Sequence, residues 1–252
     1  MESEAAQAHR ALEAVWGLLY GQVPGARFER RGDVLFALCP PLPIPQCNGP
    51  WIVEDTPSAV DALAEAIAEV DAAGAQPWVQ TRSGHERTQR AAAELGLTRR
   101  ECLPGMVVRP AELAGPAGDA LAIDRIDEGG VDTANSVLAT SFRGPRELFD
   151  HMSAVCAALD ETTWYVGRVG GEIVATAIGI TVDGVTGVFN VATAPEHRGR
   201  GHGAALTAHV AREGFDRGAT LAYLQSSQMG HSVYRRLGFR DVEEYVLLTR
   251  PM

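Results

Sequence analysis

Apolar positions in the second half of the chain recur with alternating strand and helix periods. Strand-like runs occupy Leu121–Ile123, Trp164–Val169, Glu172–Ile178, Val185–Thr193, Leu221–Gln225 and Val242–Leu248. Helical spacing predicts helices over Val131–Ser141 and Arg146–Leu159, a third helix that carries Leu206, Val210 and Phe215 and ends at Gly218, and a short helix around Ser232–Arg236. Gly170-Gly171, between two of the strands, is typical of a tight hairpin turn. The order β-α-α-β-β-β-loop-α-β-α-β predicts an α/β (α+β) unit.

The first half of the chain repeats part of this pattern. Gly74-Ala75, Trp78-Val79-Gln80 and Leu95-Gly96-Leu97 recur in the second half as Gly218-Ala219, Tyr223-Leu224-Gln225 and Leu237-Gly238-Phe239. The segment Pro110–Gly118 is small and punctuated by proline and glycine, which is typical of a linker. We therefore expect two tandem domains that arose by duplication, residues 1–115 and residues 116–252.

Composition and charge narrow the class of protein. Of the 252 residues, 46% are hydrophobic and 21% are charged, which is ordinary for a soluble globular protein. The net charge of -10 argues against a nucleic-acid partner, because binding to nucleic acid depends on basic surface. The N-terminus has no basic n-region, and its longest apolar run is far too short to span a bilayer. We expect no membrane partner and a cytoplasmic location.

The absence of lysine and the spacing of the cysteines exclude several kinds of catalytic and metal chemistry. All 22 basic residues are arginines, so the chain has no lysine to act as a nucleophile or to form a Schiff base. The four cysteines lie far apart, without Cys-x-x-Cys or a histidine at zinc-finger spacing; they are Cys39, Cys47, Cys102 and Cys156. They are predicted to be reduced, mostly buried thiols, and no metal site is predicted.

The most informative segment is Arg198-Gly199-Arg200-Gly201-His202-Gly203, which joins an apolar strand to a helix. Glycines let the backbone turn tightly and let its N–H groups approach a ligand closely. The free amides at the start of the next helix suit an anion, and the arginines, with His202 as a further candidate, add positive charge. The segment is therefore predicted to bind a phosphate or pyrophosphate.

Other phosphate-binding loops fit less well. A Walker loop needs Gly-Lys-Ser/Thr, which a chain without lysine cannot supply. Gly199-x-Gly201-x-x-Ala204 fits the dinucleotide fingerprint, but that fold needs an acidic residue at the tip of the next strand, where this chain has Gln225-Ser226-Ser227. A nicotinamide oxidoreductase therefore stays an alternative hypothesis, and it ranks behind the two that are given below. Binding of NADH would support it.

At this point the chain resembles the GNAT superfamily of acyltransferases. Its Arg/Gln-x-x-Gly-x-Gly/Ala loop is matched by Arg198–Gly203, and its Tyr followed shortly by Gly-Phe is matched by Tyr234 through Gly238-Phe239. The two matches lie within residues 185–239, and the strand order from residue 119 onward also fits. The resemblance implies a mixed, mostly antiparallel, splayed sheet with the pantetheine arm of coenzyme A between two strands. It makes the first domain a degenerate copy, since Trp51–Val70 holds no glycine for the loop and Ala92 replaces the tyrosine.

The resemblance also implies roles for individual residues. Tyr234 is expected to be the general acid that protonates the departing thiolate. Residues expected to contact coenzyme A are Val191, Thr193, Arg198, Gly199, Arg200, Gly201, His202, Gly203, Ala204 and Ser227. Ser227 departs from the family, which often has Asn at this point. No general base is assigned, and a water chain is one route for the amine proton.

The leading hypothesis is direct transfer of an acetyl group from acetyl-CoA to a primary amine, on a small molecule or a peptide. A second hypothesis is a non-catalytic acyl-CoA sensor or scaffold. The acceptor, the length of the acyl group and the oligomeric state, monomer or homodimer, stay open. Residues 131–160 are the expected acceptor side and carry no decisive chemistry.

Overall fold

A computed structural model describes residues 2–42, 44–117, 121–126 and 131–251. The contacts within the chain divide it into two compact units. Unit 1 comprises Met1–Val15 and Gly105–Val242, and unit 2 comprises Trp16–Pro104 and Glu243–Met252. Helix α1 (Glu4–Gly21) and strands β5 (Arg99–Val108) and β11 (Arg240–Thr249) contribute residues to both units.

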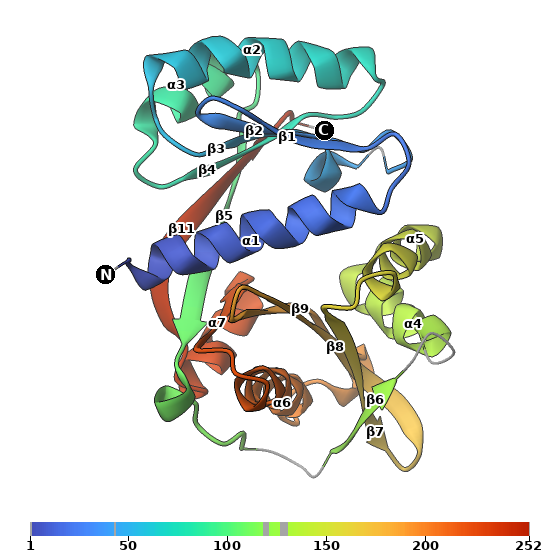
Figure 1. Cartoon of the computed structure of the whole chain (residues 1–252). Coiled ribbons are helices and arrows are strands. Elements are labelled where there is room, and N and C mark those ends of the chain that lie inside the picture. The colour runs from blue at the N-terminus through green and yellow to red at the C-terminus, as the bar shows by residue number, and fades with distance from the viewer. Residues whose placement is uncertain (1, 43, 118–120, 127–130, 252) are drawn as a thin grey trace. The chain divides into compact units, whose positions relative to one another are not determined.

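Unit 1 contains a mixed sheet with the strand order β5-β10-β9-β8-β7-β6 (Figure 1). Its further strands are β6 (Ala122–Ile126), β7 (Thr162–Val169), β8 (Glu172–Val182), β9 (Val185–Thr193) and β10 (Leu221–Gln225). Its further helices are α4 (Val131–Phe142), α5 (Arg146–Ala157), α6 (His202–Asp216) and α7 (Gln228–Arg236). Neighbouring strands are antiparallel except for the parallel pair β9 and β10. The prediction of a mixed, mostly antiparallel sheet flanked by helices is confirmed.

Helix α6 supplies the core on one face of this sheet. Its apolar side buries Leu206, Val210 and Ala211 in a cluster that also contains Val188 and Leu224 of the sheet. The helix lies unusually close to the strands, because a Cβ atom on Gly214 would come within 2.1 Å of the Thr186 hydroxyl. Glycine on the helix face therefore permits an approach that any side chain would prevent.

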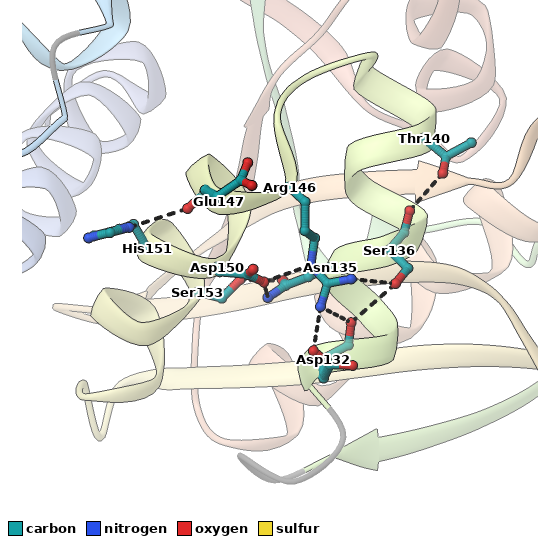
Figure 2. A network of polar contacts seen from close by, with 9 residues as sticks. All are labelled: Asp132, Asn135, Ser136, Thr140, Arg146, Glu147, Asp150, His151 and Ser153. Carbon is teal, nitrogen blue, oxygen red and sulfur yellow. Dashed lines mark hydrogen bonds and ion pairs between the residues drawn. The ribbon is translucent and has the colours of Figure 1, made fainter.

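Helices α4 and α5 form a hairpin of which α4 packs against β8 and β9. A polar network joins the two helices, with Arg146 at its centre (Figure 2). The Arg146 guanidinium pairs with Asp150 at 2.7 Å and with Asp132, and donates to the Ser136 hydroxyl at 2.6 Å. Asn135 is buried and donates to Asp150 at 2.8 Å. Because these groups satisfy one another, the network fixes the hairpin rather than offering an open polar site.

The order of elements from β1 to β5 repeats the order from β7 to β11. The elements of unit 2 are β1 (Arg27–Arg31), β2 (Val34–Leu38), β3 (Gly49–Ile52), α2 (Pro57–Ala72), β4 (Trp78–Arg82) and α3 (Glu86–Glu94), with the strand order β1-β2-β3-β4-β11. Helices α3 and α7 have nine residues each and begin 142 residues apart. Strands β5 and β11 have ten residues each and begin 141 residues apart. This equality of lengths supports the prediction of a duplication.

Most predicted elements of the second half begin and end close to their predicted residues, but β8 runs on to Val182 and α7 begins already at Gln228. Gly170 and Gly171 both have positive φ, 59° and 90°, as a two-residue hairpin turn of type I′ requires. The predicted linker runs from a short 3-10 turn at Pro110–Glu112 into extended chain, and Ala114 donates to the carbonyl of Leu237 in unit 1. Its last residue, Gly118, lies outside the described residues. The division into copies 1–115 and 116–252 stays a prediction.

Among the described residues, no helix is long and apolar enough to cross a membrane. The four cysteines are free thiols, and all except Cys102 are buried. Burial raises the pKa of the Cys156 thiol to about 12, which leaves it protonated and unreactive at neutral pH.

Candidate active site

Strands β9 and β10 separate part-way along their length. Their parallel pairing runs from Leu221 opposite Val185 to Tyr223 opposite Gly187. Within the described part of the chain no further β9–β10 pair follows, although β9 continues to Thr193. The later β9 residues, from Phe189 onward, are mostly half-buried rather than buried. Over these residues the edge of β9 that faces away from β8 pairs with no strand of the described chain.

A bulge lies in the same stretch of β9. Thr176 of β8 pairs with Ala192 and Ile178 pairs with Phe189, so Asn190 and Val191 together oppose the single residue Ala177. Asn190 has a φ of 50°, which is uncommon for a residue other than glycine. Bulges re-aim backbone groups and are frequent beside active sites.

The predicted phosphate loop turns at two glycines with positive φ, Gly199 at 79° and Gly201 at 85°. Gly201 is the N-cap of α6, and its lack of a side chain leaves the first-turn amides of the helix without a side-chain cap. This turn lies against the end of β9, since a Cβ on Gly203 would be 3.6 Å from the Thr193 hydroxyl and 3.7 Å from Val191. The predicted loop and strand residues therefore come together.

The two loop arginines are placed differently. Arg198 donates through Nε to the Thr193 carbonyl at 3.1 Å and through its terminal amine to the Ser141 carbonyl at 3.2 Å. The Ser141 hydroxyl also donates to the Thr193 carbonyl, at 3.1 Å. Arg198 thus braces the loop against α4 and β9. Arg200 is exposed, and its guanidinium has no hydrogen bond or ion pair with the residues that the structure describes.

His202 and Ser227, both predicted to contact coenzyme A, have positions in the fold that explain their residue types without a ligand. His202 is 2% exposed, and its ring centroid lies 6.4 Å from that of His197. The imidazole is thus enclosed, whereas the backbone amide of His202 is in the first turn of α6. Ser227 is the N-cap of α7, and its hydroxyl accepts from the Gly230 amide at 3.2 Å. Capping is a sufficient reason for serine at this position.

Tyr234 lies on α7 with its ring across the backbone of Gly230. A Cβ on Gly230 would be 2.7 Å from the ring and 3.3 Å from the phenol oxygen. Burial raises the pKa of Tyr234 to about 12, and a hydrogen-bond contact with Thr207 acts in the opposite direction. Thr207 is on α6 and donates to the Gly203 carbonyl at 2.8 Å. The phenol therefore lies beside the helix whose first turn follows the phosphate loop.

The structure thus brings together a splayed strand pair, a glycine turn at a helix N-terminus and a phenol beside that helix. The family model for the acetyltransferase (GNAT) family matches residues 135–239. Residues 135–239 form a GNAT acetyltransferase domain.

Solved structures resemble the chain beyond the GNAT domain. A GCN5-related N-acetyltransferase from Kribbella flavida is 23% identical with a TM-score of 0.75, over 97% of this chain and 95% of that one. A functionally unknown conserved protein from Staphylococcus epidermidis ATCC 12228 is 15% identical with a TM-score of 0.70, over 90% and 95%. A GCN5-related N-acetyltransferase from Sphaerobacter thermophilus is 22% identical with a TM-score of 0.62, over 76% and 67%. At these identities the likeness shows the fold. No curated protein sequence matches the chain.

Several residues of the GNAT domain site were not found by sequence reasoning. Ser141 lies 57 residues before Arg198, and nothing local signals their contact. Gly230 could have been noticed, because a glycine four residues before a tyrosine on a helix lies under its ring. The side chains of Thr207 and Phe189 follow the periodicity of their helix and strand, so they carried no separate signal.

Proposed function

We propose that the protein is an N-acetyltransferase that transfers the acetyl group of acetyl-CoA to a primary amine. The observation that carries the proposal is the position of the Tyr234 ring, which lies across Gly230 on α7 with its phenol beside Thr207 of α6, the helix that begins at the phosphate loop. The GNAT domain supports acyl transfer in general. The acetyl group as the cargo and the primary amine as the acceptor are part of the proposal.

In the proposed reaction the pyrophosphate is held by the free amides at the start of α6, with Arg200 as the available cation. The pantetheine amides pair with the free edge of β9 near Val191. The Thr193 carbonyl already accepts from Ser141 and Arg198, so Thr193 has its amide and hydroxyl left for the ligand.

The chemistry is a single displacement at the thioester carbonyl. The neutral amine nitrogen attacks this carbon, a C–N bond forms, and the C–S bond breaks. Tyr234 gives its proton to the departing sulfur, and the nitrogen loses a proton to water, which restores the phenol. The bulge at Asn190 and Val191 offers backbone N–H groups to the carbonyl oxygen as it gains negative charge. Positioning of the amine supplies much of the rate.

Unit 2 is proposed to be the silent copy. The turn before α2, at the place of the phosphate loop, contains Glu54 and Asp55 instead of arginine and glycine. Thr56 caps α2 with its side chain, and Pro57 removes an amide from the first turn. Both features oppose an anion: the carboxylates repel it, and the helix start offers it fewer free amides.

Thiol release from acetyl-CoA, measured with a panel of primary amines, tests the proposal. Tyr234→Phe should lower turnover by about 10²-fold or more while the Kd for coenzyme A changes less than threefold, because a general acid acts only during transfer. Tyr165→Phe is the matched control: its phenol contacts Glu213 at 3.5 Å and should be dispensable. Equal turnover in Tyr234→Phe contradicts the general-acid role. Coenzyme A binding with no thiol release for any amine would favour the sensor.

A further inference from the structure

Two aromatic rings close the point at which β9 and β10 separate. Gly187 and Tyr223 are the last paired residues of the two strands. The Phe189 ring folds back over Gly187, where a Cβ would lie 2.3 Å from it and 2.8 Å from the Tyr223 hydroxyl. Phe189 and Tyr223 meet edge to face, with ring centroids 5.9 Å apart and an interplanar angle of 89°. The two rings thus occupy the space directly beside the fork.

The other face of the fork is filled as well. Side chains alternate between the faces of a strand, so Val188 and Leu224 point opposite to Phe189 and Tyr223. Val188 and Leu224 are buried in the core cluster with Leu206 and Val210 of α6. Between the strands themselves, the backbone hydrogen bonds of the parallel pair begin at Gly187 and leave no passage. A chain that arrives at the fork therefore meets the core, the paired backbone or the two rings.

The length of the pantetheine arm brings the thioester to this place. From the pyrophosphate oxygen to the sulfur the arm contains about twelve bonds, as many as four residues of extended main chain, or about 13–14 Å. The first turn of α6 lies against Thr193. An arm that starts there and runs back along β9 ends about four residues earlier, next to Phe189.

We propose that Phe189, packed on Tyr223, sets the length of the acyl group and restricts the donor to short chains such as acetyl. This inference rests on the proposed function and adds a specificity residue to the same site. A two-carbon acyl group ends at the fork, whereas a longer chain must displace the Phe189 ring. Removing the ring opens a space lined by Tyr223 and the α-carbon of Gly187, which an alkyl chain can fill.

The test uses the full chain and stable CoA thioethers, so that binding is read without turnover. The Kd values of S-ethyl-CoA and S-hexyl-CoA are measured by calorimetry for the wild type, Phe189→Ala and Phe189→Leu. In the wild type S-hexyl-CoA should bind at least about tenfold more weakly than S-ethyl-CoA. In Phe189→Ala the ratio of the Kd of S-hexyl-CoA to that of S-ethyl-CoA should fall by about tenfold or more. The ratio for Phe189→Leu should lie between those of the wild type and Phe189→Ala. Rates with acetyl-CoA and hexanoyl-CoA should shift in the same direction.

The ratio within one variant does not depend on how much of that variant is folded. Phe215→Ala is the matched control, because Phe215 is a half-buried aromatic in the last turn of α6 and should leave the ratio unchanged. Wild-type-like discrimination in Phe189→Ala would overturn the inference, and so would tight S-hexyl-CoA binding by the wild type. Failure of coenzyme A itself to bind would instead overturn the proposed function.

Discussion

Replacing Gly230 by alanine should separate the stability of the protein from its activity. A Cβ at this position would lie 2.7 Å from the Tyr234 ring. Carbon atoms rest at about 3.5–4.0 Å, so the ring must retreat by about 1 Å. Alanine gains about 0.5–1 kcal/mol over glycine in a helix. Pushing the tyrosine off its rotamer costs about 0.5–1.5 kcal/mol. The free energy of unfolding should therefore change by less than about 1 kcal/mol.

Turnover should respond much more strongly than stability. A displacement of about 1 Å at a catalytic group can lower a rate by about 10²-fold. We expect Gly230→Ala to lose about that factor in the rate of thiol release from saturating acetyl-CoA, measured with the best amine of the panel. Urea denaturation of the same samples should give nearly the wild-type midpoint.

The double variant Gly230→Ala/Tyr234→Phe decides whether the effect passes through the phenol. If it does, the double variant should be no slower than Tyr234→Phe alone, since the two changes remove the same interaction. Wild-type turnover in Gly230→Ala would refute the reasoning. Additive losses in the double variant would assign Gly230 some other role.

Two further predictions concern the brace and the phenol. Ser141→Ala removes one of two donors to the Thr193 carbonyl and should weaken coenzyme A binding by about three- to tenfold, as expected for one hydrogen bond. Ser141→Thr keeps the hydroxyl and should restore the binding. Thr140→Ala loses only a hydrogen bond to Ser136 within α4 (Figure 2), so its Kd for coenzyme A, measured by calorimetry, should match that of the wild type. Because the pKa of Tyr234 is raised to about 12, its phenol keeps its proton at lower pH. The pH profile of kcat should therefore show no Tyr234-dependent loss below about pH 11, and a fall near pH 10 that disappears in Tyr234→Phe would contradict this.

Local patterns predicted much of the GNAT domain. The glycine pair 170–171 fixed the β7–β8 hairpin, and the apolar spacing of Leu206 and Val210 located α6. Helix α7 was predicted only around Ser232–Arg236, whereas it begins at Gln228. Its first four residues contain one apolar residue, Met229, which is exposed, and they lack apolar periodicity, so the capping serine, Ser227, was the only signal of its start.

Features that depend on distant residues were beyond reach. The bulge at Asn190 cannot be recognised from the sequence of β9 alone, because a bulge is defined by the pairing with the neighbouring strand, here β8. The brace from Arg198 to Ser141 joins segments 57 residues apart. The tight turn of the loop before α6 could be predicted from its glycines. The different positions of Arg198 and Arg200 could not be predicted, because the sequence shows the same residue type twice in one turn.

The exchange of terminal segments makes the two halves inseparable. Unit 1 includes the first fifteen residues of the chain, and unit 2 includes the last ten. A cut near residue 115 would leave the second half without the β5 residues that pair with β10, and the first half without the β11 residues that pair with β4. If the chain arose by fusion of two like copies, each has come to depend on a piece of the other. In that case neither copy can be discarded, whatever its loop binds.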